Sequence, residues 1–385
     1  MNSLLDFDEP ALSRAGGLWT AREIVQQPAS WRRTQELLQR QAAKISGFLA
    51  PLLANPHIRI ILTGAGSSAF IGECLAPVLL GRLGRRVEAI ATTDLLSGPE
   101  LFFQETVPTL LVSFGRSGNS PESIAVVELA DRLLRDCHQL VITCNEQGAL
   151  YQRCGERDNS LAILLPAETH DQSFAMTSSF TSMMLATSLA FQTAGRGGLH
   201  VGAIANAAQA LLGAHNAALR TLAGNGYSRV VFLGSNGLKG LAREAALKLL
   251  ELTDGKVVAA FDSPLGFRHG PKTIVNGDTL LFVFVSNDAY TRRYDLDLLR
   301  ELRSDGLAAR VIAITARLGD AVADGEYLHL GELEGADDEA LCYPYIVCAQ
   351  LFAFHRALVL GNRPDQPNDA GTVSRVVRGV TIHSL

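Results

Sequence analysis

Short apolar runs alternate with longer segments of helical period along most of the chain, a pattern typical of parallel strands covered by helices on both faces. In the first half, strands are predicted near 58–63, 86–91, 109–113, 138–143 and 161–165, and helices near 67–83, 120–135, 146–154 and 174–193. In the second half, strands are predicted near 229–233, 257–261, 279–285, 310–315 and 326–330, and helices near 238–252, 291–305 and 338–360. Residues 19–54 are predicted to form a helical arm, in which Thr20 and Glu23 have the spacing of a capping box.

The apolar runs repeat at a fixed separation. RIILTG at 59–64 returns as RVVFLG at 229–234, and TLLV at 109–112 returns as TLLF at 279–282, in both cases 170 residues later. This internal repeat predicts two tandem α/β domains, each a parallel sheet with helices on both faces in a flavodoxin-like, three-layer αβα arrangement. The predicted boundaries are a helical arm at 1–45, a first domain at 46–200, a second at 201–362 and a tail at 363–385.

Composition narrows the class of protein. The chain has 385 residues, enough for about two domains, and its 47% apolar and 19% charged residues exclude global disorder. A net charge of −5 argues against a nucleic-acid partner, which would need a basic face. Six scattered cysteines without a C-x-x-C pair are typical of reduced thiols in a cytoplasmic protein, and they predict no metal site.

Membrane partners are not expected. The first ten residues carry three acids and no basic segment, so they do not resemble a signal peptide. The stretch 173–195 has no charged residue, but it is rich in Ser and Thr and lies inside the α/β pattern. We therefore predict a buried helix, in the core or at a subunit interface, rather than a membrane span.

Two loops at the carboxyl ends of predicted strands have the composition of a phosphate site. The first is TGAGSS at 63–68, and the second is GRSGNSPE at 115–122. Glycines allow tight turns that expose backbone N–H groups, and serines at a helix start add hydroxyl donors. Either loop alone is equally well explained as a turn and cap, but two such loops on neighbouring strands favour a shared anion site. The first loop lacks the full G-x-G-x-x-G spacing, which disfavours a dinucleotide.

These loops resemble those of the SIS (sugar isomerase) domain family, whose members bind phosphosugars. The second copy keeps LGSNG at 233–237 but has FVSND at 284–288 where the first copy has its Ser-Gly-Asn-Ser turn. The first copy is therefore expected to bind phosphate, and the second to have lost that anion site. The expected phosphosugar-binding residues in the first copy are Gly66, Ser67, Ser68, Arg116, Ser117, Gly118, Asn119 and Ser120.

A cluster of ionisable residues follows the first loop of the second copy. Glu244, Lys248 and Glu251 are spaced i, i+4 and i+7, so they share one face of the predicted helix. A solvated surface with an ordinary Glu–Lys pair is the alternative interpretation. A histidine in a stiff turn comes next, at His269-Gly270-Pro271, although a lone histidine is more often structural.

This stretch resembles the isomerase half of glucosamine-6-phosphate synthase. The resemblance implies that Glu251 moves a proton between sugar C1 and C2, that Lys248 and Glu244 relay protons at the nitrogen-bearing carbon, and that His269 opens the pyranose ring across a dimer interface. A carboxylate works in both directions of such a transfer, and an imidazole titrates near neutral pH. The homo-oligomer is expected to be at least a dimer, with dimer and tetramer both open.

The chain departs from the pattern of the synthase in its C-terminal tail. Arg378, counted with the phosphosugar-binding residues, stands where the synthase has a lysine that forms a Schiff base. A guanidinium stays protonated and cannot form that imine, so the role of Arg378 is open. The resemblance does not include the glutamine-hydrolysing half of the synthase, so ammonia delivery from glutamine is not expected, whereas ammonia release stays open.

From about Trp19 to His383 the chain resembles the AgaS-type branch of galactosamine-6-phosphate deaminase/isomerases, also described as tagatose-6-phosphate ketose/aldose isomerases. The motifs that carry this resemblance are THD at 169–171, FAMTSS at 174–179, DSPLGFRHGPK at 262–272 and YTRRYDLDLL at 290–299. It implies conversion of D-galactosamine 6-phosphate to D-tagatose 6-phosphate and ammonia in amino-sugar catabolism, without a cofactor. Two alternatives stay open: a plain aldose–ketose isomerase acting on tagatose 6-phosphate and galactose 6-phosphate, and a non-catalytic sugar-phosphate sensor. Galacto and gluco substrates are not distinguished by the residues themselves.

Overall fold

A computed structural model describes residues 3–155, 157–192, 198–377 and 379–385. The chain forms two compact units. The N-unit comprises Ala29–Asp171, Ser178–Leu199 and Ala370–Leu385, and the C-unit comprises Met1–Pro28, Gln172–Thr177 and His200–Asp369. The domain boundaries given above stay predictions, and Arg378 lies outside the described residues.

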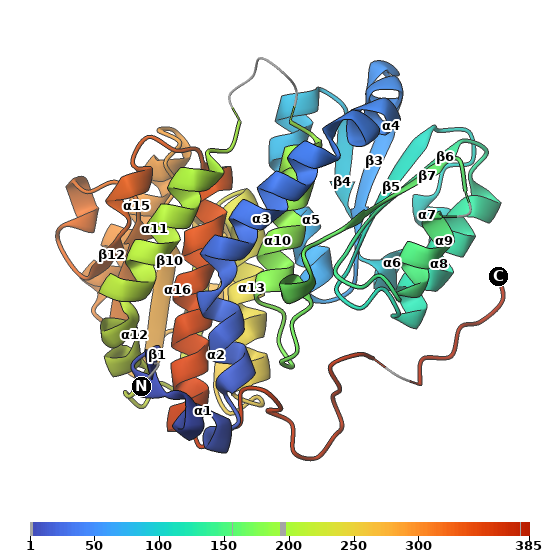
Figure 1. The fold of residues 1–385 in the computed structure, drawn as a ribbon. Coiled ribbons are helices and arrows are strands. Elements are labelled where there is room, and N and C mark those ends of the chain that lie inside the picture. Colours follow the sequence, from blue (N-terminus) through green and yellow to red (C-terminus); the bar gives the residue numbers. More distant parts are fainter. Residues whose placement is uncertain (1–2, 156, 193–197, 378) are drawn as a thin grey trace. The chain divides into compact units, whose positions relative to one another are not determined.

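The N-unit contains the first copy of the repeat. Its sheet has five parallel strands in the order β4 (Arg86–Ala89), β3 (Arg59–Thr63), β5 (Thr109–Gly115), β6 (Cys137–Thr143) and β7 (Ser160–Leu164). Helices α5 (Ser67–Leu83) and α10 (Ser178–Ala190) cover one face; α6 (Thr92–Ser97), α8 (Pro121–Leu133) and α9 (Ala149–Cys154) cover the other (Figure 1). The unit also includes α4 (Ala42–Ala54), α7 (Pro99–Phe102) and most of α3 (Gln27–Arg40).

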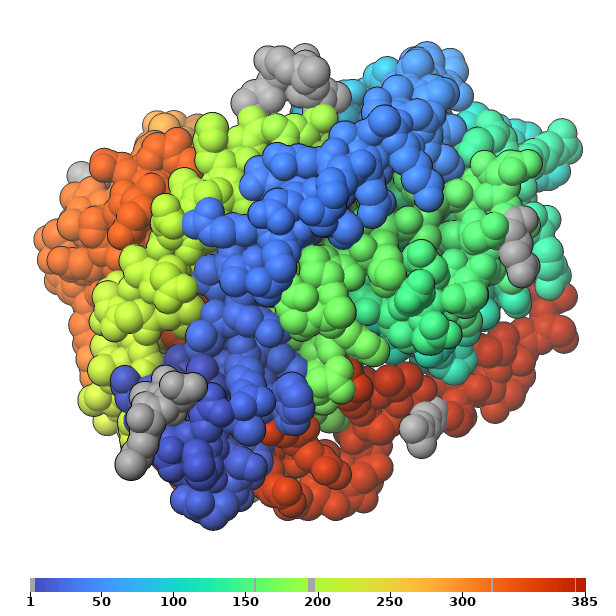
Figure 2. Space-filling view, in the orientation of Figure 1, coloured from blue at the N-terminus to red at the C-terminus, as the bar shows by residue number. Residues whose placement is uncertain are grey.

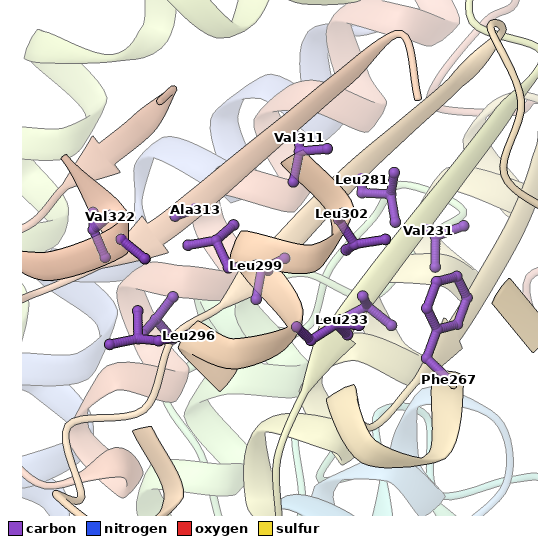
Figure 3. Close-up of a cluster of buried hydrophobic side chains, with 14 residues drawn as sticks. Val231, Leu233, Phe267, Leu281, Leu296, Leu299, Leu302, Val311, Ala313 and Val322 are labelled. Atoms are coloured by element: carbon purple, nitrogen blue, oxygen red, sulfur yellow. The ribbon is translucent and has the colours of Figure 1, made fainter. Parts of the chain in front are cut away.

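The C-unit repeats this arrangement. Its parallel strands lie in the order β9 (Val258–Asp262), β8 (Arg229–Gly234), β10 (Thr279–Phe284), β11 (Arg310–Thr315) and β12 (Tyr327–His329). Helices α11 (Val201–Ala214), α12 (Asn216–Ala223), α13 (Gly237–Leu252) and α16 (Asp338–Val359) lie on one face. On the other face, α14 (Pro264–Phe267) and α15 (Thr291–Asp305) pack a layer of Leu and Val side chains against the sheet (Figure 3). Before these elements, β1 (Ser3–Leu4) and β2 (Phe7–Asp8) form a hairpin that leads into α1 (Glu9–Ala15) and α2 (Leu18–Val25).

Both sheets have the strand order 2-1-3-4-5 of flavodoxin-like folds, which confirms the predicted fold class. In such sheets ligands bind at the carboxyl edge, where the direction of the connections reverses. In the N-unit that point lies between β3 and β5, whose register pairs Thr63 with Ser113. The two glycine-rich loops predicted to bind phosphate both begin there.

The uncharged stretch 173–195 contains a buried helix, as predicted, and its residues 193–195 lie outside the described residues. Every residue from Ser178 to Ser188 in α10 is buried, and Ser178 and Ser179 donate hydrogen bonds to the carboxylate of Asp171. Among the described residues, no helix combines the length and apolar character needed to span a bilayer. All six cysteines are buried free thiols, and burial raises the pKa of Cys144 to about 12. In the described part of the chain, no group of three or more His, Cys, Asp or Glu side chains is arranged to hold a metal ion.

The predicted capping box at the start of the arm is wrong. Helix α2 begins at Leu18, and the N–H groups of Trp19 and Thr20 donate to the carboxylate of Asp365, at 3.1 and 2.8 Å. Glu23 is buried and accepts hydrogen bonds from the backbone N–H groups of Gln172 and Ser173. Both acids therefore hold distant segments of the C-unit together, which a local spacing rule cannot reveal.

Candidate active site

The first glycine-rich loop of the N-unit ends at the start of α5. Gly66 has φ 57° and ψ −130°, a backbone conformation that glycine adopts without strain. Helix α5 then begins at Ser67, and the side chains of Ser67 and Ser68 are buried in its first turn. The N–H groups of Ser68 and Ala69 donate to the carbonyl oxygens of Ala65 and Gly66, so the donors at this turn that suit an anion are the N–H of Ser67 and the hydroxyls of Ser67 and Ser68.

The second loop is held in shape by its own side chains. Ser120 is the N-cap of α8 and accepts a hydrogen bond from the N–H of Ser123 at 3.3 Å. The side-chain oxygen of Asn119 accepts from the N–H of Ala149, and Gly118 has φ 64°. Ser117 is partly exposed, and its hydroxyl accepts from the N–H of Asn119 at 3.3 Å. Ser117, Asn119 and Ser120 therefore each have a hydrogen-bond partner, and the partly exposed Ser117 hydroxyl, which accepts that bond, can still donate one.

Arg116 connects this loop to the C-terminal segment. Its guanidinium is buried and donates to the carbonyl oxygen of Arg375 at 2.9 Å, and Arg375 in turn donates to the carbonyl oxygen of Asp171. In Figure 2 the segment from Ala370, in red, runs along the outside of the N-unit. Burial holds the pKa of His170 below its ordinary value, and the charges of Arg375 and Arg116 act in the same direction. Two arginines thus make this edge positive, and no pattern in the tail indicated Arg375.

The predicted acid–base residues meet on α13 of the C-unit. Glu244 and Lys248 are fully buried, and the Nζ of Lys248 lies 3.4 Å from Oε1 of Glu244 and 2.5 Å from Oε2 of Glu251. The side chain of Glu251 is 24% exposed. Burial of the first two residues excludes the alternative of a solvated helix face. A buried lysine bridges two carboxylates, and Glu251 is the member that solvent or a ligand can reach.

This group lies far along α13 from the glycine loop of its own unit. The helix begins at Gly237, and Glu251 is in its last turn. A rise of 1.5 Å per residue separates the two positions by about 21 Å. The acid–base group is therefore not positioned to act on an anion bound at the loop 234–237.

The turn that carries His269 is anchored on both sides. Phe267 is buried in the core between α15 and the sheet (Figure 3). The Nε of Arg268 lies 2.7 Å from Oε2 of Glu301, and Lys272 pairs with Glu301 and with Asp305. The hydrogen bond from Lys272 holds the pKa of Glu301 below its ordinary value.

Between these anchors, the side chain of His269 is exposed. Sequence reasoning missed Glu301 and Asp305. The available signal was two acids four residues apart on α15, the same spacing that separates Arg268 from Lys272.

Comparison with known proteins identifies the family. Residues 52–193 and 226–360 each match the SIS domain family. The chain belongs to the SIS domain family. The D-galactosamine-6-phosphate deaminase AgaS of Escherichia coli is 48% identical to this SIS protein over 370 residues, which are 96% of each chain. That of Shewanella sp. is 45% identical over 385 residues, 99% of this chain and 95% of the relative.

Solved structures give the same result. The tagatose-6-phosphate ketose/aldose isomerase of Escherichia coli superimposes on this SIS protein with a TM-score of 0.90 at 46% identity, covering 96% of this chain and 97% of the other. The resemblance to this branch of the SIS family, which the sequence motifs predicted, is confirmed. The roles of the individual site residues stay predictions.

Proposed function

We propose that this SIS protein is an enzyme that converts D-galactosamine 6-phosphate and water to D-tagatose 6-phosphate and ammonia, in the cytoplasm, as a step of amino-sugar catabolism. The observation that carries the proposal is the 45–48% identity to D-galactosamine-6-phosphate deaminases over nearly the whole chain. The buried Glu244–Lys248–Glu251 group supports it, because a protein that only binds a sugar phosphate has no need of a buried proton-transfer group.

The N-unit supplies phosphate binding in this proposal. Hydroxyls of Ser67, Ser68 and Ser117 and the N–H groups of Ser67 and Glu122, at the starts of α5 and α8, donate to the phosphate oxygens. Arg116 and Arg375 add positive charge at the same edge of this unit. Gly66 and Gly118 allow the backbone to turn tightly enough to bring its N–H groups to the anion.

The C-unit supplies proton transfer. After the pyranose ring opens, Glu251 removes the proton from C2 of the aldehyde form while the aldehyde oxygen takes up a proton given by the substrate's ammonium group, which yields a C1–C2 enaminol. Return of the C2 proton to C1 then gives a C2 iminium with a C1 hydroxymethyl group. Water then adds to C2, and ammonia leaves as the C2 carbonyl forms. Lys248 and Glu244 relay protons to Glu251 and to the nitrogen, and the net step is a proton shift followed by hydrolysis.

His269 is proposed to promote ring opening in the active site of a neighbouring subunit. Its side chain is exposed on a turn fixed by ion pairs, so a neighbouring subunit can reach it. Inactive Glu251→Gln and His269→Ala proteins, mixed and allowed to exchange subunits, are then expected to recover about one quarter of wild-type activity. Random exchange makes half of the dimers mixed, and one site in each mixed dimer has both residues intact. Activity that stays at the level of the separate variants would show that His269 acts within its own chain.

A plain aldose–ketose isomerase is the second candidate, favoured by the description of the Escherichia coli structural relative as a tagatose-6-phosphate ketose/aldose isomerase. Three compounds separate the candidates: galactosamine 6-phosphate, its gluco epimer glucosamine 6-phosphate, and tagatose 6-phosphate. We expect ammonia from the first, at a higher kcat/KM than from the second, and no aldose from the third. Aldose formed from tagatose 6-phosphate without ammonia from either amino sugar would establish the isomerase. Binding of all three without turnover would establish a sensor.

A further inference from the structure

The loop that binds phosphate in the first copy has a close structural counterpart in the second. Asn236 precedes α13 with φ 53° and ψ −122°, nearly the conformation of Gly66 before α5. Helix α15 begins at Thr291 and α8 at Pro121, so the two helices keep the 170-residue separation of the strands. The C-unit therefore retains the backbone of an anion site between β8 and β10, the point where the direction of its own strand connections reverses (its switch point).

Two carboxylates of the C-unit accept hydrogen bonds from the donor groups of this site. Asp295 on α15 accepts a hydrogen bond from the Ser235 hydroxyl at 2.5 Å and one from the N–H of Ser286 at 2.9 Å. Asp338 on α16 accepts from the Ser286 hydroxyl at 2.6 Å and from the N–H of Asn287 at 2.7 Å. Asp295 thus bridges the two loops that follow β8 and β10, as a phosphate would bridge them.

The first copy has no carboxylate at the position that corresponds to Asp295. The residue 170 positions before Asp295 is Ala125, which has no polar side chain. Asp295 is fully buried, and burial raises its pKa to about 6, with the charge of Asp338 acting in the same direction and the hydrogen bonds opposing it. The guanidinium of nearby Arg292 donates to the carbonyl oxygens of Ser286 and Arg317, so it holds the loop together.

We propose that Asp295 and Asp338 take the place of a phosphate group in the C-unit, so that its ancestral anion site is permanently occupied by the protein's own carboxylates. The substrate phosphate then has a single site per chain, in the N-unit. A second molecule of substrate or of a competing anion is also kept away from the N-terminus of the helix that carries Glu251. This proposal does not depend on which sugar phosphate is the substrate.

A calorimetric titration of the full-length protein with inorganic phosphate at pH 7.5 tests whether the C-unit site is occupied by its own carboxylates. Wild-type protein is expected to bind one phosphate per chain. Replacing both carboxylates, as Asp295→Ala with Asp338→Asn, frees the donors and is expected to create a second phosphate site, so that the variant binds two phosphates per chain. Adding Ser235→Ala to that variant should remove the second site again.

Asp297→Ala is the matched control, because Asp297 lies on the same helix two residues away with its side chain 56% exposed. It is expected to bind one phosphate, as wild type does. Two phosphates per wild-type chain would overturn the proposal whether or not any variant folds. A folded Asp295→Ala/Asp338→Asn protein that still binds one phosphate would overturn it too, as would a second site that survives Ser235→Ala.

Discussion

Replacing Glu251 with Gln is expected to lower kcat for ammonia release by about 10²–10⁴-fold while galactosamine 6-phosphate still binds. The amide has nearly the same shape as the carboxylate but cannot accept the C2 proton. Glu251 is the partly exposed end of the buried Glu244–Lys248–Glu251 group, so the change removes the base and leaves the fully buried pair in place. Steady-state kinetics and calorimetric titration with substrate measure the two quantities.

Two matched variants make this result interpretable. Glu332→Gln changes an exposed carboxylate in the C-unit and should leave kcat unchanged. Ser68→Ala in the N-unit should weaken substrate binding by about 10- to 100-fold, because a hydrogen bond to a charged group contributes about 1.5–3 kcal/mol, with a smaller effect on kcat. If Glu251→Gln lost binding and turnover together while folded, the role of Glu251 would be structural rather than catalytic.

Replacing Lys248 with Met is expected to lower the free energy of unfolding by about 3–5 kcal/mol. Lys248 and Glu244 are both fully buried, 3.4 Å apart at their charged atoms, and the change removes the positive charge that balances the buried carboxylate. Met has a similar length and fills most of the volume of the lysine stem, so loss of packing contributes little. Denaturant unfolding of the variant against wild type measures the difference.

The double variant Glu244→Gln/Lys248→Met distinguishes charge from packing. With the buried carboxylate neutralised, most of the lost stability should return, because a neutral pair carries a smaller desolvation cost. Activity should not return, since the proton relay is still absent. Equal stability of Lys248→Met and wild type, or a double variant as unstable as the single one, would show that the pair does not contribute as its geometry implies.

The strands and the long helices were predictable from local pattern. Helix α5 has the predicted limits, and β3 and β5 begin within a residue of their predicted starts. The strands were recognisable because a strand buried on both faces is a continuous apolar run, and each of these runs occurs in both copies of the repeat. Helices α11 and α12 were missed. Helix α11 is rich in Ala and Gly, which give a weak helical pattern, and α12 has only eight residues, too few to establish a period.

For the candidate site, the sequence predicted which residues lie together but not their environment. The i, i+4, i+7 spacing placed Glu244, Lys248 and Glu251 on one face of a helix, and the structure confirms that proximity. Their burial depends on α16, which packs against α13 from nearly a hundred residues further along the chain. The sequence also did not indicate that Asp295 and Asp338 accept the hydrogen bonds of the second anion site, because the bonds from serine hydroxyls to these carboxylates join residues more than fifty positions apart.

The two copies of the repeat have thus diverged in chemistry while keeping one fold. The N-unit retains serine-rich loops and positive charge at its switch point, whereas the C-unit has carboxylates there and a buried acid–base group at the far end of α13. In the proposed reaction the first binds the phosphate and the second moves the protons.

Incubation of purified wild-type protein with galactosamine 6-phosphate, with ammonia and tagatose 6-phosphate both quantified over time, tests the proposed deamination most directly. We expect the two products in equal amounts at every time point, since each C2 iminium that forms gives one ketose and one ammonia. No ammonia, or ketose formed without ammonia, would contradict the assignment.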